Sequence, residues 1–184
     1  MDEPGVHATS SGLIDRKNLT MMNPKTNQTD DGLLVATFLL GEAAFGIDAQ
    51  QVQEVARVGH ITPVANAPSY AVGIRNLRGR IVTVIDLRAR LELGPVVSAT
   101  GNRILIVEWQ GESVGLLVDS VADTIETRLD MLAPPPPNLH GVQSKNLRGV
   151  CRGGERLVAL LDLGPVLEPD DQISPVLAAS QAQA

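Results

Sequence analysis

Aromatic residues and cysteine are scarce in this chain of 184 residues. It contains two Phe, one Tyr, one Trp and a single Cys. So few aromatic rings disfavour a surface on which nucleic-acid bases stack, and one Cys excludes a disulfide framework and a zinc site built from several cysteines. The formal net charge of −6 also argues against binding to nucleic acid as the primary role.

Long apolar runs are absent as well. No stretch approaches the roughly 18 continuous apolar residues that a membrane-spanning helix requires. The first residues, Met1–Pro4, include neither the basic segment nor the apolar segment of a signal peptide. We therefore expect a cytoplasmic protein without direct membrane insertion.

Sequence signatures of catalysis are missing too. The three histidines lie far apart, without the spacing of metal ligands: His7, His60 and His140. The chain has no phosphate-binding loop, no dinucleotide fingerprint and no nucleophile elbow. Cys151 lies close to Arg148 and Arg152, which could lower the pKa of its thiol, although a lone Cys in a turn is usually a bystander. We expect no catalytic residue, no metal site, no cofactor and no enzymatic activity.

Aliphatic side chains dominate what is present. Hydrophobic residues make up 43% of the chain, which is typical of a globular protein. Residues 1–32 are polar and lack any period, so we predict a disordered extension. Residues 168–184 hold three acids and no base, and we predict a flexible acidic tail or a short helix. The ordered domain is expected to span 33–167.

The ordered region contains an internal repeat. The sequence Asn-Leu-Arg-Gly at 76–79 recurs at 146–149, and each copy precedes an apolar run that ends in Asp-Leu, at Asp86 and Asp162. The distance from motif to Asp differs by six residues, which we assign to a hairpin turn inserted at 151–155. The repeat predicts two half-domains, 33–99 and 100–167.

Each half also begins with a strand–turn–strand pattern that leads into a short segment with apolar spacing near 3.6 residues. This spacing predicts a helix over 49–57, capped by Asp48, and a second helix over 118–125. Asp119 and Asp123 would then lie four residues apart on a solvated helix face. Short strands with Gly-rich turns indicate a small barrel or sandwich. A barrel of about 65 residues is marginal alone, so we expect two, packed face to face around a shared core.

Several motifs resemble the CheW family, the scaffold adaptors of bacterial chemosensory arrays. They are Phe45-Gly46-Ile47-Asp48, Val52-Gln53-Glu54-Val55, the stretch from Pro68 to Gly79 and Val84-Ile85-Asp86-Leu87, with weaker matches in the second half. The resemblance covers about 33–167. It implies a mainly β fold of two Src-homology-3-like five-stranded β-barrels, related by internal duplication and sharing a hydrophobic core, with short helices.

The resemblance also implies a function and its partners. A CheW-like protein is a non-catalytic adaptor that couples the coiled-coil tip of a chemoreceptor to the regulatory domain of a CheA-type histidine kinase. Such a protein would be cytoplasmic and recruited to receptor arrays at the inner membrane face. Two alternatives remain: an array paralogue that caps or competes without activating the kinase, and a small-barrel nucleic-acid-binding module.

Five residues are candidates for receptor binding: Val52, Glu54, Val55, Arg75 and Arg78. The arginine of the family that matches Arg78 lies at the receptor-binding surface, so the resemblance makes Arg78 the strongest of them. On spacing alone, the valines could equally be core residues and Glu54 a solvated charge. Arginine is suited to pairing with the carboxylates of an acidic partner. Five arginines lie within sixteen residues, which could form a basic patch or an ordinary surface: Arg75, Arg78, Arg80, Arg88 and Arg90.

Seven further residues are expected to have structural roles: Gly73, Asn76, Gly79, Asp86, Asn146, Gly149 and Asp162. Asn and Gly tolerate the positive φ that a bend between strands requires. We expect the two Asp residues to accept hydrogen bonds from backbone amides where their strands end.

Overall fold

The computed structural model describes residues 32–94, 99–136 and 144–168. The predicted extension and tail therefore lie outside the described residues, apart from Gly32 and Glu168. All of the described residues belong to one compact unit of the chain, Asp31–Ala184.

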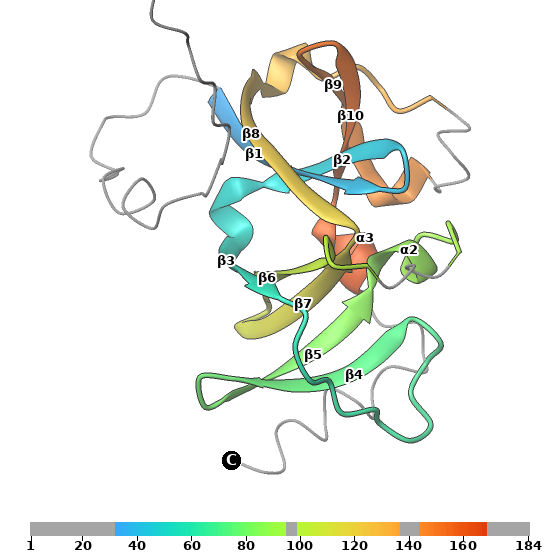
Figure 1. Ribbon diagram of the computed structural model, residues 1–184. Coiled ribbons are helices and arrows are strands. Elements are labelled where there is room, and N and C mark those ends of the chain that lie inside the picture. Colours follow the sequence, from blue (N-terminus) through green and yellow to red (C-terminus); the bar gives the residue numbers. More distant parts are fainter. Residues whose placement is uncertain (1–31, 95–98, 137–143, 169–184) are drawn as a thin grey trace, which may run out of the picture. The chain divides into compact units, whose positions relative to one another are not determined.

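The described residues form ten strands and five short helical segments (Figure 1). The strands of the first half are β1 (Gly32–Leu40), β2 (Ala43–Asp48), β3 (Val52–Arg57), β4 (Ala71–Leu77) and β5 (Arg80–Asp86). Those of the second half are β6 (Arg103–Trp109), β7 (Glu112–Val118), β8 (Ser120–Arg128), β9 (Leu147–Gly153) and β10 (Arg156–Leu161). The helical segments are η1 (Ala49–Gln51), α2 (Leu87–Arg90), η2 (Leu129–Met131), η3 (Ser144–Asn146) and α3 (Leu163–Leu167). The predicted fold class, mainly β with two five-stranded sheets, is confirmed.

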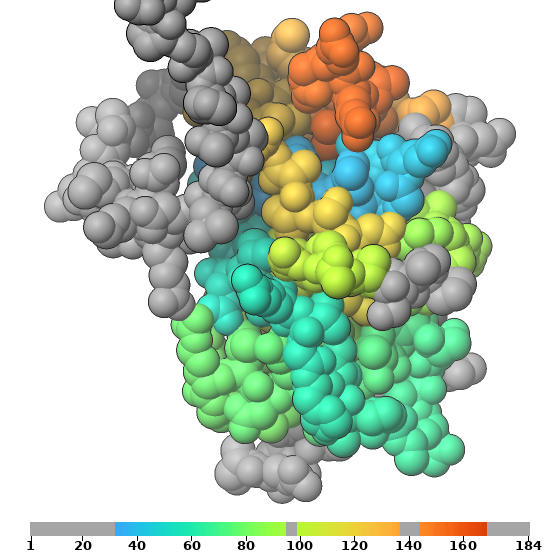
Figure 2. All heavy atoms as spheres, in the orientation of Figure 1, coloured from blue at the N-terminus to red at the C-terminus, as the bar shows by residue number. Residues whose placement is uncertain are grey.

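The two halves exchange strands between the sheets. One sheet, here sheet A, has the order β8-β1-β2-β10-β9, and the other, sheet B, has the order β3-β6-β7-β5-β4. Each sheet thus combines the first hairpin of one half with three strands of the other (Figure 1). On the molecular surface, blue residues of the first half accordingly lie beside orange residues of the second half (Figure 2). The halves join through two parallel pairs, β2 with β10 and β5 with β7. The expectation that each barrel is made from one half is therefore wrong.

In each sheet, one isolated bridge connects the chain beyond one edge strand to the strand at the opposite edge. After β3, at one edge of sheet B, the chain returns to β4 at the other edge, where Thr62 and Ile74 exchange backbone hydrogen bonds of 2.8 Å in both directions. After β8, at one edge of sheet A, Ala133 pairs in the same way with Val150 of β9. These bonds give the edge strands β4 and β9 a backbone partner that follows the opposite edge strand of the same sheet. Each sheet therefore curls toward a barrel, and its edges are partly covered.

Gly73 and Gly149 permit these closures. A Cβ atom at Gly73 would lie 2.2 Å from the Thr62 carbonyl oxygen, and one at Gly149 would lie 2.9 Å from that of Ala133. Gly73 also has a φ of +145°, which L side chains rarely adopt. Both glycines are therefore required because another backbone approaches them closely, and neither forms a bend.

The bend between β4 and β5 is made by other residues of the first Asn-Leu-Arg-Gly copy. Arg78 and Gly79 have φ values of +54° and +87°. The side chain of Asn76 holds the turn, because its Oδ1 accepts a 2.8 Å hydrogen bond from the Gly79 amide.

The two Asn-Leu-Arg-Gly copies are not structurally equivalent. The first ends β4 and turns into β5, whereas the second ends η3 and begins β9. The position equivalent to Asn146 is Tyr70, because their carbonyls accept hydrogen bonds from the amides of Asp162 and Asp86, at 2.9 and 2.7 Å. The duplication is real, but this four-residue match is out of register.

The length difference between the halves also lies elsewhere than predicted. In the two closing bridges, Thr62 and Ala133 are 71 positions apart, whereas Ile74 and Val150 are 76 apart. The extra residues of the second half therefore lie between the end of β8 and the start of β9. The turn at 151–155 holds no insertion, because its strands align with β4 and β5 at the same offset.

The two predicted helices are strands instead. Only Ala49–Gln51 is helical in the first segment, where the Asp48 carboxylate accepts a 2.9 Å hydrogen bond from the Gln50 amide, so the cap is confirmed for a shorter turn. Residues 120–128 of the second segment form β8. In β3, a bulge between Val52 and Glu54 shifts the register. Because of this bulge, Val52 and Val55 lie on the same face of the strand although they are three positions apart. A spacing of three is also typical of one face of a helix, which explains the wrong prediction.

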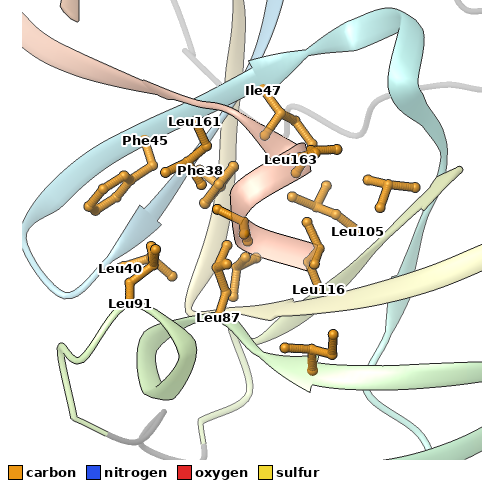
Figure 3. Close-up of a cluster of buried hydrophobic side chains, with 14 of the residues drawn as sticks. Phe38, Leu40, Phe45, Ile47, Leu87, Leu91, Leu105, Leu116, Leu161 and Leu163 are labelled. Atoms are coloured by element: carbon orange, nitrogen blue, oxygen red, sulfur yellow. The ribbon is translucent and has the colours of Figure 1, made fainter. Parts of the chain in front are cut away.

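A single large core lies between the sheets (Figure 3). Phe38, Phe45 and Ile47 of sheet A face Leu105 and Leu116 of sheet B. The short helices α2 and α3, which begin at the Leu of each Asp-Leu sequence, complete this core with Leu87, Leu163, Val166 and Leu167. Leu91, just after α2, and Leu161, at the end of β10, also belong to it. The two halves therefore share their apolar burial as well as their strands.

The strand exchange predicts that neither half folds alone. A chain ending at residue 99 would keep β1–β5 but lose β8, β9 and β10 from sheet A and β6 and β7 from sheet B. We expect this fragment to be insoluble or to lack a cooperative thermal transition, measured by circular dichroism. A soluble fragment with a sharp melting transition would contradict the shared architecture.

The close approach at Gly73 predicts a large effect of a small substitution. Gly73→Ala should lower the free energy of unfolding by more than about 3 kcal/mol, because its Cβ would overlap the Thr62 carbonyl. Gly79→Ala is the matched control, since it also has positive φ but no atom within 4 Å, and should cost about 1 kcal/mol. Urea denaturation measures both, and equal costs would show that the bridge tolerates the methyl group.

Candidate functional site

The five predicted receptor-binding residues lie on or beside the two edge strands of sheet B. Val52, Glu54 and Val55 belong to β3, Arg75 belongs to β4, and Arg78 lies in the turn after β4. These strands are at opposite ends of the sheet order, and the Thr62–Ile74 bridge connects the chain after β3 to β4. The closure of sheet B thus explains how Glu54 and Arg78, which are 24 positions apart in the sequence, come into contact.

An ion pair joins the two charged candidates. Nη2 of Arg78 lies 3.2 Å from Oε2 of Glu54. The side chain of Arg78 is 65% exposed and that of Glu54 is 23% exposed. The carboxylate therefore restrains the arginine from one side, while much of the guanidinium group remains open to a partner.

The other three candidates differ in accessibility. Val55 is 46% exposed, whereas Val52 is half-buried and packs against the main core. Arg75 donates a hydrogen bond to the Arg57 carbonyl and braces the end of β3 against β4. Two residues that sequence reasoning missed, Val58 and Ile81, are also large, apolar and exposed, each at 41%.

The five arginines of the 75–90 segment do not form one patch. Arg90 donates to the carbonyls of Val166 and Glu168 at 2.7 and 2.9 Å, and its guanidinium group lies 4.8 Å from the centre of the Tyr70 ring. Together with Arg88, which forms an ion pair, it lies at the α2 end of β5, about 20 Å from the turn at the other end of that strand. The local positive charge is thus divided between a surface turn and an internal junction.

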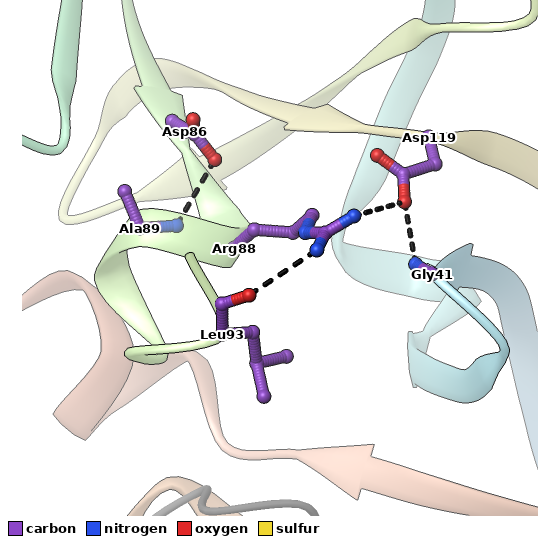
Figure 4. Close-up of polar contacts among 6 residues, drawn as sticks. All are labelled: Gly41, Asp86, Arg88, Ala89, Leu93 and Asp119. Atoms are coloured by element: carbon purple, nitrogen blue, oxygen red, sulfur yellow. Dashed lines mark hydrogen bonds and ion pairs between the residues drawn. The ribbon is translucent and has the colours of Figure 1, made fainter. Parts of the chain in front are cut away.

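Asp119 is the centre of that junction (Figure 4). Its Oδ2 lies 3.1 Å from Nη1 of Arg88 and accepts a hydrogen bond from the Gly41 amide, and Arg88 also donates to the Leu93 carbonyl. These contacts connect the β1–β2 hairpin of sheet A with α2, which follows sheet B. The prediction of a solvated helix face is therefore wrong for the helix and for Asp119, whose side chain is only 21% exposed. Asp123 is exposed as predicted, but it lies on β8.

The two Asp-Leu sequences begin short helices that the sequence analysis did not identify. Oδ1 of Asp86 accepts a 3.0 Å hydrogen bond from the Ala89 amide at the start of α2. Oδ1 of Asp162 accepts one of the same length from the Gly164 amide at the start of α3. Aspartate at this position is a common N-cap, so the signal was present in the sequence.

Cys151 is buried in β9 and has no feature of a reactive thiol. Burial raises its pKa, and a hydrogen bond with Thr127 lowers it by less. The expectation that neighbouring arginines lower this pKa is wrong, because Arg148 and Arg152 are exposed while the thiol is enclosed. Across the described parts of the chain, no group of three His, Cys, Asp or Glu could hold a metal ion. Those parts also include no helix long and apolar enough to cross a membrane.

The Glu54–Arg78 pair should contribute little to stability. Because Arg78 is mostly exposed, Glu54→Ala and Arg78→Ala should each lower the free energy of unfolding by less than about 1 kcal/mol. Chemical denaturation measures this value. A loss of several kcal/mol would instead make the pair a structural element of sheet B.

Two five-stranded, barrel-like sheets that share one large core define the class of this protein as a double-barrel β domain. A family model described as a CheW-like domain matches residues 34–170. The chain is 30% identical over 138 residues to the chemotaxis protein CheW of Treponema pallidum, covering 73% of this chain and 81% of that protein. It is 31% identical over 134 residues to that of Klebsiella aerogenes, with the same coverage.

A solved structure supports the same assignment. The scaffolding protein TtCheW from Thermoanaerobacter tengcongensis matches with a TM-score of 0.71 and 28% sequence identity. The match covers 85% of this chain and 97% of that one. The chain belongs to the CheW family of chemotaxis scaffold proteins.

Proposed function

We propose that this chain is a non-catalytic adaptor that couples the cytoplasmic tips of chemoreceptors to a CheA-type histidine kinase. It would act at the inner membrane face, within receptor arrays. The observation that carries the proposal is the exposed Arg78, held beside β3 by Glu54 in a chain with a CheW-like domain over residues 34–170. The family arginine that Arg78 resembles belongs to the receptor-binding surface.

The surface has the composition that docking of a receptor helix requires. Val55 offers an exposed apolar side chain on β3, and Ile81 offers another on β5. Arg78 supplies a charged rim that can pair with a carboxylate of the receptor. Helices commonly bind through apolar anchors with charged edges, and small interfaces of this kind suit reversible assembly.

The alternative of nucleic-acid binding has little support from this geometry. It depended on a concentration of five arginines, of which Arg75, Arg88 and Arg90 are bound to backbone carbonyls or to Asp119. An array paralogue that competes without activating the kinase would have the same fold. Kinase activity reconstituted with receptor, kinase and this chain distinguishes the two, because only a coupling adaptor would raise it.

Arg78→Glu should weaken binding to a purified receptor cytoplasmic fragment by at least about tenfold, because it reverses the exposed charge. Isothermal titration calorimetry measures the affinity. The matched control is Arg80→Glu, which makes the same change at an exposed position two residues away. Unchanged affinity for Arg78→Glu would refute the assigned surface.

A charge swap separates two roles for Arg78. The double variant Glu54→Arg, Arg78→Glu restores an ion pair within the chain but moves the positive charge to β3. If Arg78 contacts a receptor carboxylate directly, the swap should bind as weakly as the single variant. Recovery of affinity would show that the pair matters only for the local structure of sheet B.

A further inference from the structure

Sheet B closes along a seam between β3 and β4, the strands at the two ends of its order. Beyond the end of β3, the isolated bridge described above joins the two edges through their backbones. Two arginine side chains from the β4 side also cross the seam. Arg75 donates a hydrogen bond to the Arg57 carbonyl, and Arg78 forms the ion pair with Glu54. The seam is therefore held in part by side chains.

The corresponding seam of sheet A is bridged at the same position by a different residue. Cys151 follows Val150 as Arg75 follows Ile74, so the two closing bridges put Cys151 and Arg75 at equivalent places. The buried thiol of Cys151 forms a hydrogen bond with Thr127 of β8, the opposite edge strand. This position thus reaches across the seam in both sheets, with a small buried side chain in sheet A and a long charged one in sheet B.

The guanidinium group of Arg75 is turned toward the backbone that follows β3. A Cβ atom at Gly59 would lie 2.9 Å from its Nη2 and 3.1 Å from its Cζ, so the glycine leaves the space that this group fills. Arg75 is half-buried, whereas the side chain of Arg78 is mostly exposed. Arg75 is therefore placed to hold the seam, and Arg78 is placed to meet a partner.

The state of the seam determines how firmly the Arg78 side chain is held. Its backbone is fixed within the β4–β5 turn, by a hydrogen bond that does not involve β3. Its guanidinium group, in contrast, is restrained by Glu54, and the place of Glu54 depends on how closely β3 approaches β4. Arg75 holds β3 at Arg57, three residues from Glu54. Loss of that contact would let the carboxylate move away from Arg78.

We propose that Arg75 is a positioning residue for receptor binding, which acts through Glu54 and Arg78 without contacting the receptor. The inference rests on the proposed function, in which Arg78 meets a carboxylate of the receptor. A side chain that is already held in its bound position loses less conformational entropy on binding. Loosening the seam should therefore weaken binding even when the fold is intact.

The test measures the affinity of the full chain for a purified receptor cytoplasmic fragment by isothermal titration calorimetry. Arg75→Ala should weaken binding by about fivefold, because residues of one contact network are coupled. Arg75→Lys should stay within about twofold of the wild type, since an ammonium group can also donate to the Arg57 carbonyl. Gly59→Ala should weaken binding about as much as Arg75→Ala, because the new methyl group displaces the guanidinium group.

Thermal stability distinguishes this role from a merely structural one. Gly59→Ala pushes only on the end of a flexible side chain, so its melting temperature should stay close to that of the wild type while its affinity falls. Gly101→Ala is the matched control at another exposed glycine, where the new Cβ would lie 3.4 Å from the Asp119 carbonyl oxygen, an ordinary contact. It should change neither quantity. A loss of affinity in Gly59→Ala that only follows a loss of stability would overturn the positioning role.

Amide hydrogen exchange tests the seam without any receptor. Arg75→Ala should speed exchange of the Thr62 and Ile74 amides, which close sheet B, by at least about threefold. The Ala133 and Val150 amides make the same bridge in sheet A and serve as the internal control. Unchanged exchange at Thr62 and Ile74 would show that Arg75 does not hold the seam.

Double variants separate positioning from direct contact. If Arg75 acts through Arg78, adding Arg75→Ala to Arg78→Ala should weaken binding by less than about twofold further. If the two losses multiply instead, Arg75 contributes independently of Arg78 and the inference is wrong. Gly59→Ala should likewise add nothing to Arg75→Ala, because the group that it displaces is already gone.

The outcomes also separate this inference from the proposed function. If Arg75→Ala and Gly59→Ala bind the receptor fragment normally while Arg78→Ala binds it weakly, the positioning role is wrong and the receptor surface stands. If Arg78→Ala binds normally, the proposed surface fails and the inference fails with it.

Discussion

The parallel pairing of β2 with β10 and of β5 with β7 is the constraint on which the structure depends. Each pair joins strands from different halves, so neither sheet exists until both halves are present. The hairpins that cross over carry the largest core side chains, including Phe38 and Phe45, whose ring centroids lie 6.3 Å apart. Because the shared core forms only around these exchanged hairpins, duplication here produced one cooperative unit from two copies.

Equivalent positions with a backbone role have kept the same residue in the two halves. Gly73 and Gly149 both admit a closing strand, and Asp86 and Asp162 both cap the helix that follows. The surfaces have diverged. Sheet B presents the Glu54–Arg78 ion pair, whereas the β9–β10 hairpin of sheet A presents the exposed side chains of Arg148, Arg152 and Arg156. At Gly73 and Gly149, any side chain would overlap the backbone of the closing segment, so these positions have to remain glycine. Exposed positions have no such restriction and can change with their binding partners.

Much of the architecture could be predicted from sequence, and the errors have physical causes. The family motifs indicated the fold class, and the motif from Pro68 to Gly79 includes Gly73, where closure of sheet B excludes any side chain. The helix predicted over 49–57 failed because a bulge in β3 reproduces helical apolar spacing over a few residues. Strand exchange and the Arg88–Asp119 contact could not be predicted, since both depend on pairings between residues distant in sequence. The Asn-Leu-Arg-Gly repeat misled because identical letters occupy a turn in one half and a strand in the other.

Strand exchange also determines when this protein can fold during synthesis. On one side β2 pairs with β10, which ends at Leu161, so this edge of β2 stays unpaired until nearly all of the domain has left the ribosome. The first hairpin must wait with its apolar face exposed while more than a hundred residues are translated, at about 5–20 residues per second. For several seconds the nascent chain therefore presents unpaired strand edges, a state in which chaperones commonly bind. Pairings of such high sequence separation also favour slow folding of the released chain.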